Sequence, residues 1–122
     1  MPDTDAAQAV RAVMDCWKAG IDAHEPQRVA ELFTGDAIFQ GLRPYSVGPQ
    51  GVAAYYDSQP LGMTVSYDIL ETRRVAAGNV LAYLNADFSI PDRPMISVRI
   101  GILVTQAGGR AKIAYYQASR IE

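Results

Sequence analysis

The sequence predicts one α+β domain in which three short helices precede a curved antiparallel sheet. Apolar residues recur at three- and four-residue steps in the first half of the chain, which is the period of an amphipathic helix. From residue 63 onward the period changes to two, which is the period of a half-buried strand. At 122 residues the chain suits one hydrophobic core and is too short for two. We therefore expect a single domain over 1–122.

Three helices are predicted at 5–21, 26–34 and 50–58. Proline opens the second and third, because the first helical position leaves an N–H unpaired and proline has none to lose. Gly35 ends the second helix. The first helix carries a single apolar stripe, formed by Ala6, Val10, Val13, Met14, Trp17 and Ile21.

The strands are separated by short turns rich in glycine, proline or asparagine. A short strand is predicted at 36–40, followed by a loop over 41–48. Long strands joined by such turns pair most simply as an antiparallel meander. The four long strands are predicted at 63–74, 80–89, 95–106 and 110–121.

The end of the second helix resembles a known superfamily. Residues 29–33 read Val-Ala-Glu-Leu-Phe and lead into Asp36-Ala37, a Leu-Phe pair followed by an acid-Ala step. Together with the element order, this resembles the nuclear transport factor 2-like superfamily, in its SnoaL-like and ketosteroid isomerase-like branch. The resemblance implies a cystatin-like fold in which a cone-shaped sheet encloses an apolar pocket. It also implies a homodimer through the outer face of the sheet.

The catalytic groups of the isomerase are replaced in this chain. Counting back without a gap from Leu-Phe, Trp17 occupies the position of the isomerase's oxyanion tyrosine. Gly41 occupies the position of its base aspartate. Its protonated aspartate falls on Gly101, or on Ile100 if the strand register differs by one. Since that mechanism needs a carboxylate base and an acidic oxyanion hole, we expect no ketosteroid isomerase activity.

Histidine chemistry of the cyclase kind is also not supported. Many SnoaL-like proteins carry a histidine in the last strand, where residues 115–119 here read Tyr-Tyr-Gln-Ala-Ser. The single histidine, His24, lies between the first two helices. Whether the protein is an enzyme stays open, and an isomerase, cyclase or hydratase of a hydrophobic carbonyl compound is the class that the resemblance implies. The alternative is a non-catalytic dimerisation or protein-assembly domain.

Aromatic residues on the inward faces predict a pocket for a hydrophobic small molecule. Its polar contact would come from Gln40, Trp17 or Arg99. The expected ligand-binding residues are Trp17, Phe39, Gln40, Tyr55, Phe88, Arg99 and Tyr116.

The face that Arg99 occupies decides its role. Ile96, Val98, Ile100, Ile102 and Val104 alternate with it, and that aliphatic face is either the lining of the cone or the dimer interface. If Arg99 shares a face with Asp87, a cross-strand ion pair explains it. If it lies beside Phe88 in the pocket, it is an anchor for an anionic ligand.

Composition excludes several other functions. Eleven basic residues against 13 acidic ones leave no basic excess for binding nucleic acid. One cysteine, Cys16, and one histidine cannot build a usual zinc site, so we expect no metal and no cofactor. Cys16 is expected to be buried beside Trp17. Residues 1–5 lack the features of a signal peptide, and no apolar stretch approaches the ~20 residues of a membrane span. We therefore expect a cytoplasmic protein with no membrane partner.

Overall fold

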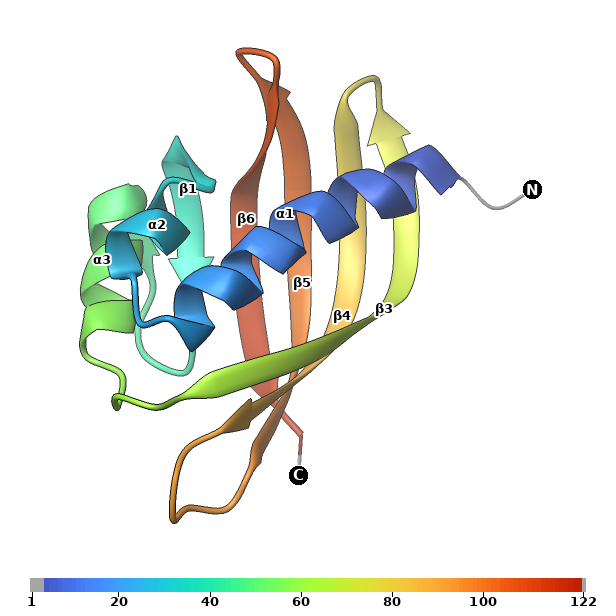
Figure 1. Ribbon diagram of the computed structural model, residues 1–122. Coiled ribbons are helices and arrows are strands. Elements are labelled where there is room, and N and C mark those ends of the chain that lie inside the picture. Colours follow the sequence, from blue (N-terminus) through green and yellow to red (C-terminus); the bar gives the residue numbers. More distant parts are fainter. Residues whose placement is uncertain (1–3, 122) are drawn as a thin grey trace.

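The computed structural model describes residues 4–121, and the acidic start of the chain at 1–3 lies outside the described residues. Three helices precede or interrupt the first strands, and four long strands follow (Figure 1). The helices are α1 (Thr4–Asp22), α2 (Pro26–Ala30) and α3 (Pro49–Asp57). The strands are β1 (Phe33–Gln40), β2 (Ser46–Val47), β3 (Thr64–Ala76), β4 (Asn79–Ser89), β5 (Ile96–Ala107) and β6 (Arg110–Arg120).

All six strands belong to one curved, open sheet in the order β2-β1-β6-β5-β4-β3. Strands β3 to β6 form the predicted antiparallel meander. Only the β1–β6 pair is parallel. The register of β3 against β4 shifts between Ile69 and Glu71, and such a bulge bends a strand and increases its twist. The α+β class and the curved sheet on three helices are confirmed.

Helix α1 crosses the concave face of the sheet (Figure 1). Its stripe of apolar residues is buried as predicted, with Trp17 and Met14 fully inaccessible. The end of the helix is tied to the start of β3 from both sides. Lys18 Nζ donates to the carbonyl of Val65 at 2.7 Å, and the carboxylate of Asp22 accepts from the Val65 N–H at 3.0 Å. These two hydrogen bonds fix the C-terminal end of α1 against the start of β3.

The aliphatic face of β5 lines the inside of the sheet, which resolves the alternative left open above. Val98, Ile100 and Ile102 are fully buried under the helices. The partners of Ile100 in the flanking strands are Leu84 and Ala118, which are also buried. The residues between them on β5 therefore face away from the helices.

Three local predictions were wrong. Helix α2 ends at Ala30, and Phe33 begins β1, because the carbonyl of Leu32 already accepts a hydrogen bond from Ile113 N at 2.8 Å in β6. The predicted loop contains the short strand β2. Cys16 is exposed, because its side chain lies outside the buried stripe of α1 that contains Val13 and Met14.

Candidate functional site

A small cavity lies at the open end of the layer between helices and sheet. Its volume is about 40 Å³, measured as the space open to the centre of a water molecule. That space holds only a few water molecules, at roughly 10–15 Å³ each on this measure. Its walls come from the loop after β1, from α3 and the segment that joins it to β3, and from β4, β5 and β6 with the turn after β4. The lining residues are Gly41, Leu42, Tyr55, Gln59, Met63, Phe88, Ile90, Ile96, Val98, Tyr116 and Ala118.

The described residues that line this cavity carry no carboxylate, imidazole, thiol or amine. Its polar side chains are the hydroxyls of Tyr55 and Tyr116 and the amide of Gln59. A phenol or an amide can donate a hydrogen bond to a ligand, but neither removes a proton at neutral pH. The cavity is therefore equipped to orient a polar ligand atom and lacks a general base.

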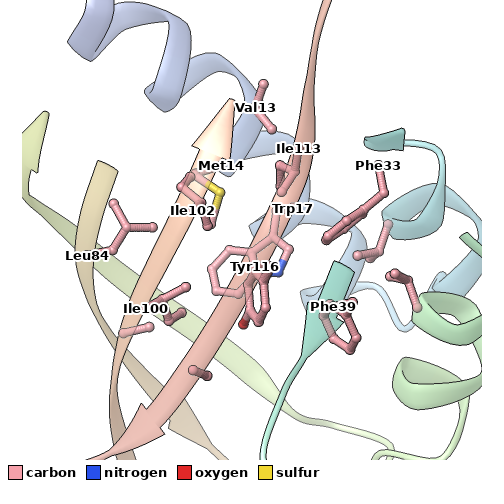
Figure 2. Close-up of a cluster of buried hydrophobic side chains, with 14 of the residues drawn as sticks. Val13, Met14, Trp17, Phe33, Phe39, Leu84, Ile100, Ile102, Ile113 and Tyr116 are labelled. Carbon is pink, nitrogen blue, oxygen red and sulfur yellow. The ribbon is translucent and has the colours of Figure 1, made fainter. Parts of the chain in front are cut away.

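Behind the cavity, an aromatic cluster fills the cone. The ring of Tyr116 stacks on Phe39 at 4.9 Å between centroids and lies 6.2 Å from Trp17. Trp17 meets Phe88 edge to face at 6.0 Å. Figure 2 shows Trp17, Phe33, Phe39 and Tyr116 converging between α1, β1 and β6. Since Tyr116 and Phe88 also line the cavity, the cavity floor is one side of the buried core.

A chain of hydrogen bonds runs through this cluster. Trp17 Nε1–H donates to the hydroxyl of Tyr56 at 3.0 Å, and Tyr56 is hydrogen bonded to Tyr116. Burial raises the pKa of both phenols above their ordinary value, and that of Tyr116 well above it. Both groups therefore stay neutral at physiological pH. Tyr116 is the member of the chain that reaches the cavity wall.

Tyr55 covers the mouth of the cavity. Its hydroxyl accepts a hydrogen bond from Leu42 N at 3.2 Å, which holds the ring over the loop that follows β1. A Cβ at Gly41 would clash with the ring of Tyr55. The loop can approach the ring this closely only because residue 41 has no side chain.

Of the seven residues expected in the pocket, three line the cavity, namely Tyr55, Phe88 and Tyr116. Trp17 and Phe39 support the floor from behind and are 0% and 2% exposed.

Gln40 and Arg99 lie on the outer face of the sheet instead. Gln40 pairs with Gln117, whose neighbours Tyr116 and Ala118 face inward. Arg99 pairs with Asn85, and its Nε donates to the Asn85 Oδ1 at 3.0 Å. Asp87 shares that face but accepts a 2.6 Å hydrogen bond from Ser97. Arg99 therefore holds a cross-strand contact, with Asn85 in place of the expected aspartate, and cannot anchor a ligand in the cavity.

Eight lining residues were not named as site residues, although alternation placed several of them inward. Met63 directly precedes β3, and Ile96 and Val98 belong to the aliphatic face of β5. The other five are Gly41, Leu42, Gln59, Ile90 and Ala118. Their apolar spacing was visible, but the same spacing is typical of core residues. Nothing in the sequence distinguishes a cavity wall from a filled core.

The positions that correspond to the isomerase's catalytic residues lie in different parts of the structure. Trp17 is buried behind the cavity, Gly41 lines it, Ile100 faces the core and Gly101 faces outward. None of these side chains can exchange a proton at neutral pH. Within residues 4–121, no three histidine, cysteine, aspartate or glutamate side chains cluster closely enough to hold a metal ion. No described helix is both long and apolar enough to cross a membrane.

No family model and no curated protein sequence matches this chain. Solved structures do match, at low identity. A domain of unknown function with a cystatin-like fold from Nostoc punctiforme has a TM-score of 0.82 at 17% identity, over 99% of this chain and 80% of that one. A ketosteroid isomerase-like protein from Erwinia carotovora has a TM-score of 0.81 at 18% identity, over 99% of both chains. A candidate scytalone dehydratase from Novosphingobium aromaticivorans has a TM-score of 0.81 at 16% identity, over 100% and 89%.

These proteins differ in their described activities while sharing one architecture, so the likeness establishes the fold and leaves the reaction open. The resemblance noted in residues 29–37 is thereby confirmed at the level of structure. This chain has the expected cystatin-like fold.

Proposed function

We propose that this protein binds an apolar carbonyl compound in the cavity between its helices and its sheet. The observation that carries the proposal is the neutral phenol of Tyr116 in the lining of a cavity that has no charged side chain. The hydroxyl of Tyr56 accepts from Trp17 and is hydrogen bonded to Tyr116 behind the cavity. A ligand carbonyl oxygen is the acceptor that such a donor suits.

The cavity must enlarge to accept a ligand of more than a few atoms. The residues at its mouth can do this without unfolding the core. Met63 has an unbranched, flexible side chain that adapts to irregular space, and Gln59 is only partly buried. Tyr55 is held over the mouth by a hydrogen bond from Leu42 N–H and by edge contacts with Phe39 and Tyr56. Displacing these three side chains opens the space in front of Tyr116 at the cost of the two ring contacts, and leaves Tyr116 packed against Trp17 and Phe39.

The geometry favours binding over acid–base catalysis. An isomerisation, cyclisation or hydration in this cavity would depend on Tyr116 polarising the carbonyl, because the lining supplies no base. Superfamily neighbours with the fold include an isomerase-like protein and a candidate dehydratase. Substrate chemistry of that kind needs a proton acceptor that this lining does not contain, so the bound compound is held and oriented.

A screen of apolar ketones and aldehydes by thermal shift tests this function. A compound that binds the folded state raises the melting temperature as its concentration rises. Ala118→Leu places three more carbons in the cavity and should abolish the shift. Ser119→Leu adds bulk at the next residue, whose exposed side chain faces outward, and should leave the shift unchanged. An equal response of both variants to every hit would contradict binding in the cavity.

Tyr116→Phe tests the polar contact separately. It should weaken the binding of a ketone about tenfold, the effect of losing one buried hydrogen bond of about 1.4 kcal/mol. A hydrocarbon of the same shape should bind the variant and the wild type equally. If the ketone also binds both equally, Tyr116 does not contact the carbonyl.

The second candidate function is assembly through the outer face of the sheet. On that face, five adjacent strands each contribute one apolar residue, and each of these residues pairs with the one on the neighbouring strand. The row spans four strand spacings, about 19 Å, and Val47, Ile38 and Leu81 are 58%, 46% and 44% exposed. Its members in order are Val47, Ile38, Tyr115, Leu103 and Leu81.

A continuous apolar row of this kind is typical of a protein contact, because exposure to water is unfavourable. The same patch on a second copy is the partner that we infer, giving a twofold homodimer. Leu81→Glu should convert the dimer to a monomer in light scattering coupled to size exclusion. Leu61→Glu, the same change at a leucine that is 75% exposed in the turn before β3, is the matched control. A wild type that is monomeric at high concentration would rule this assembly out.

A further inference from the structure

A second hollow adjoins the cavity at the open end of the sheet. Its volume is about 430 Å³ on the same measure, so it is roughly ten times larger than the cavity and open to solvent. Ile90 and Ile96 line both spaces. Figure 1 shows the β4–β5 loop and the C-terminal end of β6 at the same end of the sheet. The remaining walls are Arg93, Pro94, Met95, Ser97, Arg120 and Ile121.

Strand β6 leads from the cavity to this hollow along one face. Tyr116 and Ala118 line the cavity, and Arg120 comes two residues later on the same side of the strand. Arg120 pairs with the inward-facing Val98 of β5. Arg120 lies four residue steps after Tyr116 along the strand, which is about 13 Å at ~3.3 Å per residue. The path between them is apolar and is formed by Ala118, Val98 and Ile96.

Two guanidinium groups, those of Arg93 and Arg120, lie at the outer end of this path. Within residues 4–121, neither Arg93 nor Arg120 forms an ion pair or donates a side-chain hydrogen bond. Asp92 is adjacent to Arg93 in the chain but is exposed and forms no ion pair with it. Asp87 faces outward and is bonded to Ser97. Among the described residues, the charged side chains that line the hollow are therefore both arginines, and they lie beside an apolar passage.

The geometry points to a ligand with an apolar body and one carboxylate. Its body would enter the cavity toward Tyr116, and its carboxylate would bind Arg120 and Arg93 in the hollow. Guanidinium groups match a carboxylate in both charge and shape. This inference deepens the proposed function and rests on it, since the body occupies the same cavity. It also relocates the anion contact from Arg99, on the outer face, to the mouth.

The test uses 4-(4-bromophenyl)butanoate and its amide, which have the same shape and differ in charge. Calorimetry measures their affinity. The bromine quenches tryptophan emission on close approach, and Trp17 is the only tryptophan in the chain. Because Trp17 lies behind Tyr116 and Phe88, quenching reports that the apolar end has entered the cavity.

We expect the acid to bind about tenfold more tightly than the amide, as one charge-assisted contact provides, and both to quench Trp17. Arg120→Gln should remove the preference for the acid and leave the affinity of the amide unchanged. Arg99→Gln, the matched change on the outer face, should keep the preference. Added salt should weaken the binding of the acid and leave that of the amide unchanged, because salt screens the charge of exposed arginines.

Equal affinity for acid and amide, with quenching by both, would overturn the carboxylate inference and leave the proposed cavity intact. Binding of the acid without quenching would also overturn it, since the arginines would then hold the anion outside the cavity. If neither compound nor any ketone binds, the proposed function itself fails.

Discussion

Replacing Trp17 by phenylalanine tests the aromatic floor on which the cavity depends. Trp17 is 0% exposed, and indole has two more ring carbons than phenyl, besides its nitrogen. At ~0.8 kcal/mol per buried carbon, their loss costs about 2 kcal/mol. The hydrogen bond from Nε1 to the Tyr56 hydroxyl, at 3.0 Å, contributes about 1 kcal/mol more. We therefore expect the free energy of unfolding to fall by about 3 kcal/mol.

Urea denaturation followed by circular dichroism measures this loss. The melting temperature should fall by about 10 °C for a domain of this size. A double-mutant cycle with Tyr56→Phe isolates the hydrogen bond, and its coupling energy should be about 1 kcal/mol. A total loss below about 1 kcal/mol, or a coupling energy of zero, would refute both the burial of the indole and its role in supporting the phenols.

Three further predictions concern the cavity walls and the outer face. Burial raises the pKa of Tyr116 above its ordinary value of about 10, so the unfolded chain loses this proton at a lower pH than the folded protein does. The contribution of Tyr116 to the free energy of unfolding should therefore be constant below pH ~10 and fall above it. The fall should be less steep in Tyr116→Phe. Gly41→Ala should displace the ring of Tyr55, which the new Cβ would clash with, and lower the free energy of unfolding in urea titrations by about 1–3 kcal/mol. Gly35→Ala, whose new Cβ meets nothing within 4 Å, should cost far less. Arg99→Met should leave carboxylate affinity unchanged in calorimetry, and a weakened affinity would return the anion contact to the outer face.

The sequence predicted the meander well because two independent signals agreed. Alternation marked each long strand, and a turn of glycine, proline or asparagine separated it from the next. The bounds of β6, Arg110–Arg120, differ from the predicted 110–121 by one residue. Local signals also placed Pro26 and Pro49 at helix starts. These features depend on neighbours in the chain, so the chain alone reveals them.

Errors arose where distant segments decide the conformation. Phe33 continues a helical apolar face in the sequence, yet β6 captures the preceding carbonyl and draws Phe33 into the sheet. Phe39 and Gln40 were both expected in the pocket, although neighbours in a strand face opposite sides. Phe39 faces inward, so strand geometry already excluded Gln40. Arg99 required the cross-strand register, which no local pattern supplies.

The size of the cavity lies beyond pattern analysis. Tyr116 and Trp17 were correctly expected on inward faces, but whether inward residues enclose space or fill it depends on side-chain packing to within an ångström. Here the aromatic cluster fills the deep part of the cone and leaves about 40 Å³ at its mouth. The resemblance implied an apolar pocket inside the cone. Side-chain packing leaves only a small one, and the lining side chains must move before it can hold a larger ligand.

Methyl NMR during titration with a ketone that raises the melting temperature tests the central claim most directly. Met63, Ile96 and Val98 carry methyl groups on the cavity wall, whereas Ile38 and Val47 carry them on the outer face. We predict saturable shifts of the first three signals at one common dissociation constant, with the last two unmoved. Shifts confined to Ile38 and Val47 would show that the compound binds the outside of the sheet, and would contradict a ligand site between the helices and the strands.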